Sequence, residues 1–147
     1  MINPHIFREY DVRGVVGEAL TPDTVLALGK GFGTYASRKG LKTVMLGRDC
    51  RLSSPEFRDA MAEGLTSTGL SVVDVGICPS PLLYFSIIRY SADGGVMITG
   101  SHNPPEFNGF KLCVGPSPPY GEKIQYVRRI IEAGAFSEGK GKIAART

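Results

Sequence analysis

The sequence predicts an α/β protein, a three-layer α/β/α sandwich on a mixed, mostly parallel sheet. Two observations lead to this fold class. Short apolar runs rich in Val, Ile and Leu alternate with longer segments whose apolar residues recur every three to four positions. Glycine, proline or serine bounds these segments. Such alternation of strands and helices is typical of a largely parallel sheet covered by helices on both faces.

Four short apolar runs are predicted as buried strands because turn-forming residues flank each of them. They are residues 41–47, 70–76, 95–99 and 109–114. The last run follows the third after only a short loop, which is too short for a parallel crossover. We therefore expect these two strands to pair antiparallel, and the sheet to be mixed.

The first helix is predicted to begin after Thr21, a good N-cap, with Pro22 in its first turn. It should end before Gly40, which stands where a C′ glycine belongs. Three glycines inside this helix lower its intrinsic stability, so another element should pack closely on it; they are Gly29, Gly31 and Gly33. Three further helices are predicted from Ser54-Pro55 to Gly69, from Ser80-Pro81 through Ile88, and from Gly121 to Gly134.

The length of 147 residues fits one domain, which we assign to residues 1–136. Residues 137–147, which begin Ser-Glu-Gly-Lys-Gly-Lys, are predicted to be a flexible tail or linker. No apolar run is long enough for a membrane span, and no apolar stretch follows the first residues as in a signal peptide. We therefore expect a cytoplasmic protein with no membrane partner.

The net charge of +3 comes entirely from residues 121–147, because residues 1–120 are balanced. This pattern favours a solvated helix face and a tail over a nucleic-acid surface, which usually interleaves basic residues with aromatics. The three cysteines are odd in number and form no C-x-x-C pair. That argues against a disulfide framework and against a zinc site.

The most chemically distinctive segment is Thr99-Gly100-Ser101-His102-Asn103-Pro104, which directly follows a predicted buried strand. It sets a hydroxyl, an imidazole and an amide side by side at a strand end, where ligands bind in folds of this class. Residues 108–111, Asn-Gly-Phe-Lys, bring a lysine back toward this loop, and residues 7–14 supply arginines and a tyrosine. A phosphorylated serine among cations is chemically coherent, since a phosphate carries close to two negative charges. The alternative is a simple turn, because Ser, Asn, Gly and Pro are all turn formers.

Four motifs in order resemble the α-D-phosphohexomutase family, in its bacterial phosphomannomutase/phosphoglucomutase branch. They are residues 7–14, FREYDVRG; residues 47–54, GRDCRLSS; residues 99–104, TGSHNP; and residues 108–111, NGFK. The resemblance covers about residues 6–136. It matches only the first of the four domains that the family's enzymes have.

The resemblance implies that Ser101 is phosphorylated and donates its phosphoryl group to a sugar monophosphate. The resulting bisphosphorylated sugar would return a phosphoryl group to Ser101 from its other position, so that hexose 1-phosphate and hexose 6-phosphate interconvert. Mg²⁺ would bind the phosphate of Ser101, and a sugar bisphosphate would act as activator. Hexose phosphates and the remaining domains of a parent enzyme are the expected partners.

The resemblance also assigns roles to further residues. Arg13 and Tyr10 would hold the phosphoserine region, with Asn103 and Arg48 as further phosphate or substrate contacts. His102 and Lys111 are both candidates for handling the proton of the sugar hydroxyl, since imidazole titrates near neutral pH and a lysine can act as a base when its pKa is depressed. The residues leave the choice between these two open. Arg51, Ser53 and Ser54 are weaker candidates for the site, and for the two serines a helix-capping role is at least as good an interpretation.

The sequence departs from the full family pattern in lacking an Asp-x-Asp-x-Asp metal segment. The isolated chain is therefore expected to have little or no mutase activity. A non-catalytic phosphosugar-binding or assembly module is the alternative function. A serine hydrolase using Ser101 and His102 is disfavoured, because adjacent residues rarely adopt nucleophile–base geometry and Ser101 lacks the flanking glycines of a nucleophile elbow.

Overall fold

The computed structural model describes residues 3–8, 11–100, 103–115 and 121–145. Four helices and six strands build it, after a short 3₁₀ helix at Pro4–Ile6. The helices are α1 (Pro22–Arg38), α2 (Ser54–Ser67), α3 (Ser80–Arg89) and α4 (Glu122–Ala133). The strands are β1 (Val12–Val15), β2 (Thr43–Arg48), β3 (Ser71–Ile77), β4 (Gly94–Ile98), β5 (Phe107–Val114) and β6 (Ile143–Ala145).

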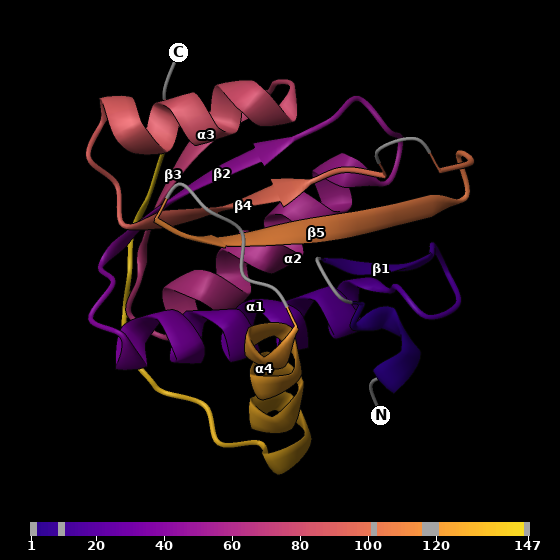
Figure 1. The fold of residues 1–147 in the computed structure, drawn as a ribbon, viewed down its shortest axis with the longest axis horizontal. Coiled ribbons are helices and arrows are strands. Elements are labelled where there is room, and N and C mark those ends of the chain that lie inside the picture. Colours follow the sequence, from indigo (N-terminus) through magenta and orange to yellow (C-terminus); the bar gives the residue numbers. More distant parts are fainter. Residues whose placement is uncertain (1–2, 9–10, 101–102, 116–120, 146–147) are drawn as a thin grey trace.

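The six strands form one mixed sheet in the order β1-β5-β4-β2-β3-β6. β4, β2, β3 and β6 run parallel to one another, whereas β5 pairs antiparallel with both β4 and β1. Figure 1 shows α3 on one face of the sheet and α1, α2 and α4 on the other. The predicted α/β/α sandwich with a mixed, mostly parallel sheet is therefore confirmed.

Successive side chains of a strand point to opposite faces of the sheet, and they contribute to two separate hydrophobic cores. In β2, Val44 and Leu46 face the α1 and α2 side, while Met45 faces α3. The same alternation holds in β4, where Met97 lies under α3 between two residues of the larger core. Continuous apolar runs are what a sheet covered on both faces requires, and the central strands have them.

The predicted first helix has the expected ends and the expected close neighbour. The side-chain oxygen of Thr21 accepts from the backbone N–H of Thr24, and Gly40 has a φ of +83°. A Cβ added at Gly29 would lie 3.0 Å from the Cα of Gly64 in α2, and one added at Gly64 would lie 2.6 Å from a carbonyl oxygen of α1. These glycines let the two helix backbones touch.

The capping role predicted for Ser53 and Ser54 is wrong. Ser53 occupies the N-cap position of α2 but its side chain caps no backbone N–H. Both hydroxyls instead accept hydrogen bonds from the buried side chain of Asn108 in β5. Ser54 also donates to Asp49, so these serines join α2 to the loop after β2 and to β5.

Two strands were missed by the sequence prediction, and one of them lies in the predicted tail. β6 pairs parallel with β3, and the backbone N–H of Gly139 and of Gly141 donates to carbonyls at the end of α2. A Cβ on Gly141 would collide with the carbonyl oxygen of Leu70. The glycines that suggest a flexible linker instead allow close backbone contact, and residues 143–145 form an edge strand of the sheet. The predicted connection to a further domain is a separate expectation and stays a prediction.

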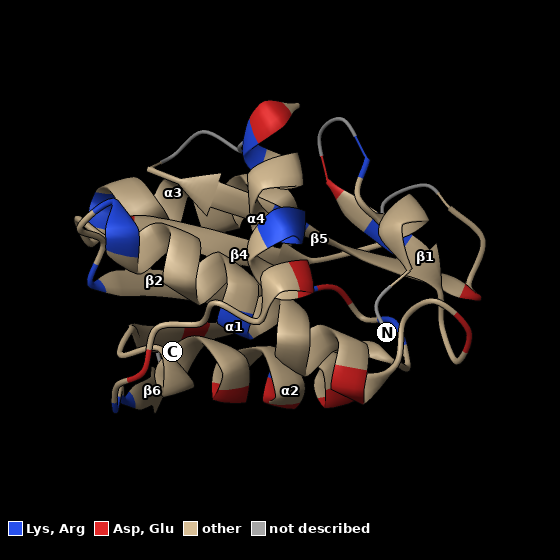
Figure 2. Ribbon diagram, turned by 90° about the horizontal axis from the view of Figure 1, so that it is seen from below, with Lys and Arg blue, Asp and Glu red and all other residues tan. Residues whose placement is uncertain are grey.

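Charges are unevenly distributed over the surface. Exposed acidic side chains follow one another along the outer face of α2, at Glu56, Asp59 and Glu63 (Figure 2).

Within the described residues, no helix is both long enough and apolar enough to cross a membrane.

Candidate functional site

The loops that follow β2 and β4 meet at the carboxyl ends of these parallel strands. The backbone N–H of Asp49 donates to the carbonyl of Ile98 at 2.9 Å, and that of Thr99 donates to the carbonyl of Gly109 in β5 at 2.9 Å. This is the sheet edge where the predicted phosphoserine loop was expected. Ser101 and His102 themselves lie outside the described residues, as does Tyr10.

The carboxylate of Asp49 accepts hydrogen bonds from both loops at this edge of the sheet. Its Oδ1 accepts from the Ser54 hydroxyl at 2.7 Å and from the backbone N–H of Arg51 at 3.1 Å. Its Oδ2 accepts from the Nε of Arg51 at 3.2 Å and from the backbone N–H of Gly100 at 3.0 Å. Burial alone would raise the pKa of Asp49, but these hydrogen bonds, together with one from the Thr99 hydroxyl, outweigh it and lower the pKa. The carboxylate is therefore ionised and fully engaged.

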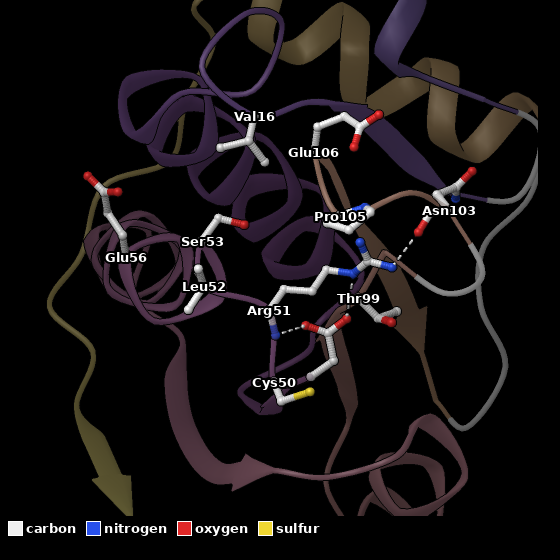
Figure 3. Close-up of a pocket in the computed structure, with 11 residues that line it drawn as sticks. Val16, Cys50, Arg51, Leu52, Ser53, Glu56, Thr99, Asn103, Pro105 and Glu106 are labelled. Atoms are coloured by element: carbon white, nitrogen blue, oxygen red, sulfur yellow. Dashed lines mark hydrogen bonds and ion pairs between the residues drawn. The ribbon is translucent and has the colours of Figure 1, made fainter.

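Arg51 reaches across to the far side of the loop. Its Nη1 donates to the carbonyls of Pro104 and Phe107, and its Nη2 donates to the carbonyl of Asn103 at 2.8 Å. Figure 3 shows the guanidinium of Arg51 directed toward Asn103, among the residues that line a cleft. The cleft measures about 830 Å³, and Val16, Cys50, Leu52, Ser53, Glu56, Thr99, Pro105 and Glu106 complete its lining.

Asn103 closes the loop on itself. Its backbone N–H and its side-chain Nδ2 both donate to the carbonyl of Gly100 at 2.9 Å. The structure thus places Asn103, predicted as a phosphate or substrate contact, in the wall of the cleft, with its amide nitrogen used to shape the loop.

Lys111 and Arg13 share one face of the sheet. Lys111 alternates in β5 with Leu112 and lies opposite Met97, on the face that carries α3. Arg13 alternates in β1 with the buried Val12 and pairs with Gly109, which brings it to the same face two residues along β5. The structure therefore brings these two predicted residues together next to the loop after β4.

These two cations differ in their partners. Arg13 Nη2 lies 2.6 Å from Asp11 Oδ2, while its buried Nε has no hydrogen-bond partner within the described residues. Lys111 forms no ion pair with any residue that the structure describes. It lies close enough to Cys113 to oppose the effect of burial, which nevertheless raises the pKa of that thiol to about 12.

Arg48 is not brought to the same place. Its Nη1 lies 3.6 Å from Oδ1 of Asp74 in β3, and Asp74 also accepts from Arg58 of α2 at 2.6 Å. This network lies between the sheet and α2. Arg48 therefore pairs with Asp74 and does not line the cleft, whereas the nearby residues Asp49 and Arg51 do.

Sequence reasoning missed the structural importance of Asp49, Arg51 and Asn108. Asn108 is completely buried, and its side chain holds the two serines at the start of α2. All three belong to motifs named above, residues 47–54 and 108–111. Their charged or polar side chains within these motifs were the sequence feature that could have indicated a role. Their hydrogen-bond partners lie up to 56 residues away in the sequence and follow only from the fold.

No described residues form a group of three or more His, Cys, Asp or Glu side chains that could hold a metal ion. Asp49, which accepts from the Gly100 amide of the loop, already accepts hydrogen bonds at both oxygens. The described residues therefore do not fit a Mg²⁺ site of their own.

Known proteins resemble this chain over nearly its whole length. Residues 4–138 match the family described as phosphoglucomutase/phosphomannomutase, alpha/beta/alpha domain I. A phosphoglucomutase of Neisseria gonorrhoeae is 44% identical over 135 residues, and a phosphomannomutase/phosphoglucomutase of Pseudomonas aeruginosa is 43% identical over 138. These matches cover 92% and 94% of the chain but only 29% and 30% of the relatives, so the chain spans less than a third of their length.

The fold agrees with solved structures of the same kind. A phosphoglucomutase/phosphomannomutase family protein from Burkholderia thailandensis superposes with a TM-score of 0.94 at 38% identity, over 99% of this chain and 33% of that one. A phosphomannomutase, described as putative, from Thermus thermophilus superposes with a TM-score of 0.87 at 29% identity. The chain belongs to the phosphoglucomutase/phosphomannomutase family and corresponds to its alpha/beta/alpha domain I.

Proposed function

We propose that this chain is the phosphoserine-bearing domain of a hexose phosphate mutase, and that Ser101 is the residue that carries the phosphoryl group. The observation that carries the proposal is the loop after β4. Its flanks at Gly100 and Asn103 are anchored at the carboxyl end of the sheet, with Lys111 and Arg13 on neighbouring strands. The family membership of the chain supports the same reading.

The proposed reaction interconverts hexose 1-phosphate and hexose 6-phosphate. The sugar hydroxyl oxygen would attack the phosphorus on Ser101, breaking the bond from phosphorus to the serine oxygen and giving a hexose bisphosphate. Ser101 would then attack the other phosphate of the reoriented sugar, which restores the phosphoserine and releases the isomeric monophosphate. Each transfer conserves the phosphoryl group, so no other reactant is consumed.

In this proposal the protein contributes positioning and charge. Phosphoryl transfer requires in-line placement and stabilisation of the charge on the transferring group more than covalent assistance. Lys111 and Arg13 would supply positive charge from the sheet face. Either Lys111 or His102 would take the proton of the attacking hydroxyl, as the sequence leaves open. Mg²⁺ on the phosphate of Ser101 and a sugar bisphosphate as activator stay expectations of the resemblance, and no step here depends on the metal.

The hexose phosphates are proposed as substrates and the remaining domains of a longer protein as partners. The relatives are about three times as long as the matched region, which supports the idea that this chain supplies one part of a composite site. We therefore expect the isolated chain to turn over hexose phosphates at least a thousandfold more slowly than a full-length relative.

Phosphate transfer to Ser101 tests the proposal directly. The purified chain is incubated with glucose 1,6-bisphosphate and Mg²⁺, and intact and peptide mass spectrometry locates the added phosphate. Phosphate on Ser101, and its loss in Ser101→Ala, are the expected results. Label on another serine, or an unlabelled Ser101 at millimolar bisphosphate, would contradict the assignment. Turnover of glucose 1-phosphate at the rate of a full-length relative would overturn the expectation that the site is composite.

A further inference from the structure

Arg51 uses most of its hydrogen-bonding capacity on backbone and carboxylate partners around one loop. A guanidinium has five N–H donors. The Nε hydrogen is directed to Asp49, and the terminal nitrogens donate to the carbonyls of Asn103, Pro104 and Phe107, at 2.8 to 3.2 Å. Little capacity is left for a substrate phosphate, although an arginine beside a phosphate-handling loop would suggest that role.

The acceptors of Arg51 lie on both sides of the dipeptide Ser101-His102 in the sequence. On the N-terminal side, Asp49 connects the guanidinium to the backbone N–H of Gly100. On the C-terminal side, the guanidinium bonds directly to the carbonyl of Asn103. One side chain and its counterion therefore fix the backbone before and after the proposed phosphoserine.

Gly100 is matched to this arrangement. A Cβ built at Gly100 would overlap the Cζ and Nε atoms of Arg51, so the guanidinium occupies the space that any side chain at this position would need. The planar head of Arg51 packs directly against the loop backbone. Its side chain is only 16% exposed, so the packing and the hydrogen bonds are largely shielded from water.

We propose that Arg51 is a positioning residue, which with Asp49 holds the backbone on both sides of Ser101 in the geometry needed for phosphoryl transfer. This inference rests on the proposed function for the role of Ser101. The contacts of Arg51 and Asp49 with the backbone of Gly100 and Asn103, which we call the clamp, can be measured without any substrate. Lysine should not replace Arg51, because its single ammonium group cannot reach a carboxylate and three carbonyls spread around a planar fork.

Amide hydrogen exchange on the unmodified chain tests the clamp. The variants are Arg51→Ala and Arg51→Lys, with Arg58→Ala as a matched control that removes another arginine paired to aspartate, away from the loop. We expect exchange at Gly100 and Asn103 to accelerate at least tenfold in both Arg51 variants. Exchange at Val96, in the centre of β4, should change less than twofold, and Arg58→Ala should leave the two loop amides within twofold of wild type.

Three outcomes would overturn the inference. Wild-type exchange in Arg51→Lys would show that positive charge alone suffices. Equal acceleration at Val96 would show that Arg51 supports the whole fold rather than the loop. Unchanged loop exchange in Arg51→Ala would show that other contacts hold the loop.

A second pair of variants tests the packing between Arg51 and Gly100. Gly100→Ala alone should accelerate loop exchange at Asn103 at least tenfold, because the methyl group displaces the guanidinium. In the Arg51→Ala background the same change should add less than threefold, since the space is then free. Equal effects in both backgrounds would contradict direct packing.

The phosphate-transfer assay links the clamp to the proposed function. Arg51→Ala and Arg51→Lys should slow phosphate transfer to Ser101 at least tenfold, and Arg58→Ala should not. A labelled wild type with equally rapid labelling of the Arg51 variants would overturn the positioning role. An unlabelled wild type would contradict the proposed function, while the exchange results would still decide whether the clamp exists.

Discussion

Replacing Asp49 with asparagine should destabilise the chain through a defined loss of hydrogen bonds. The carboxylate accepts two hydrogen bonds at each oxygen, from the Ser54 hydroxyl, the Gly100 amide, and the Nε and amide of Arg51, and a further one from the Thr99 hydroxyl. An asparagine side chain offers one oxygen and one NH₂ group, so the two donors at one carboxylate oxygen would face another donor in either orientation.

The expected magnitude follows from these two lost bonds. Hydrogen bonds to a charged group contribute about 1.5–3 kcal/mol each. The Asp49 side chain is 21% exposed, so water can replace part of this, and we expect a net loss of roughly 2–4 kcal/mol for Asp49→Asn. For a chain of this length that corresponds to a fall in Tm of roughly 5–15 °C.

The effect should also depend on pH with a known sign. The folded-state pKa of Asp49 is lowered, so its ionised form stabilises the chain above the ordinary carboxyl pKa of about 3.9. This contribution is lost as the pH falls through the folded-state pKa. The stability difference between wild type and Asp49→Asn should therefore be full at pH 7 and should shrink below about pH 4.

Urea denaturation followed by circular dichroism, at pH 7 and at steps down to pH 3, measures both effects. Asp59→Asn is the matched control, since Asp59 also pairs with an arginine but is 74% exposed, and it should change stability by less than about 0.5 kcal/mol. An Asp49→Asn variant as stable as the control at pH 7, or a deficit that does not shrink in acid, would refute the reasoning.

Three further changes test the packing of the fold. Gly64→Ala replaces a helix glycine, which by itself would stabilise α2 by about 1 kcal/mol. The added methyl group would lie 2.6 Å from the carbonyl oxygen of Leu26, and this overpacking should destabilise the chain by roughly 2–3 kcal/mol and dominate. A higher free energy of unfolding in urea would contradict the close α1–α2 contact. A thiol reagent at pH 8 should modify the exposed Cys50 in the native chain and spare the buried Cys78 and Cys113, the latter with a pKa of about 12, until the chain is unfolded. Intact mass counts the labels, and a second label on native protein would contradict the burial of these two thiols. Truncation after Ser137 should cost roughly 1–3 kcal/mol through the lost β6 hydrogen bonds, and an unchanged Tm would restore the flexible-tail interpretation.

Much of the fold could be predicted from the sequence because its signals are local. The four central strands are short, largely apolar runs, and the four helices have turn-forming boundaries, so both appear within short windows of sequence. The ends at Thr21 and Gly40 depend on capping geometry within one helical turn. β1 and β6 were missed because they are short edge strands whose pairing partners, β5 and β3, are far away in the chain.

The sequence by itself determined the α/β class, the succession of the central strands and helices along the chain, and the position of the Thr99–Pro104 segment after a strand. Only the tertiary structure decided which polar residues act on that loop. Arg48 and Arg51 look equivalent in the motif, yet one pairs with Asp74 under α2 and the other holds Asn103. The physical reason is that a side chain's partners depend on the face of the strand or loop from which it projects and on which distant backbone carbonyls the sheet brings within hydrogen-bonding distance.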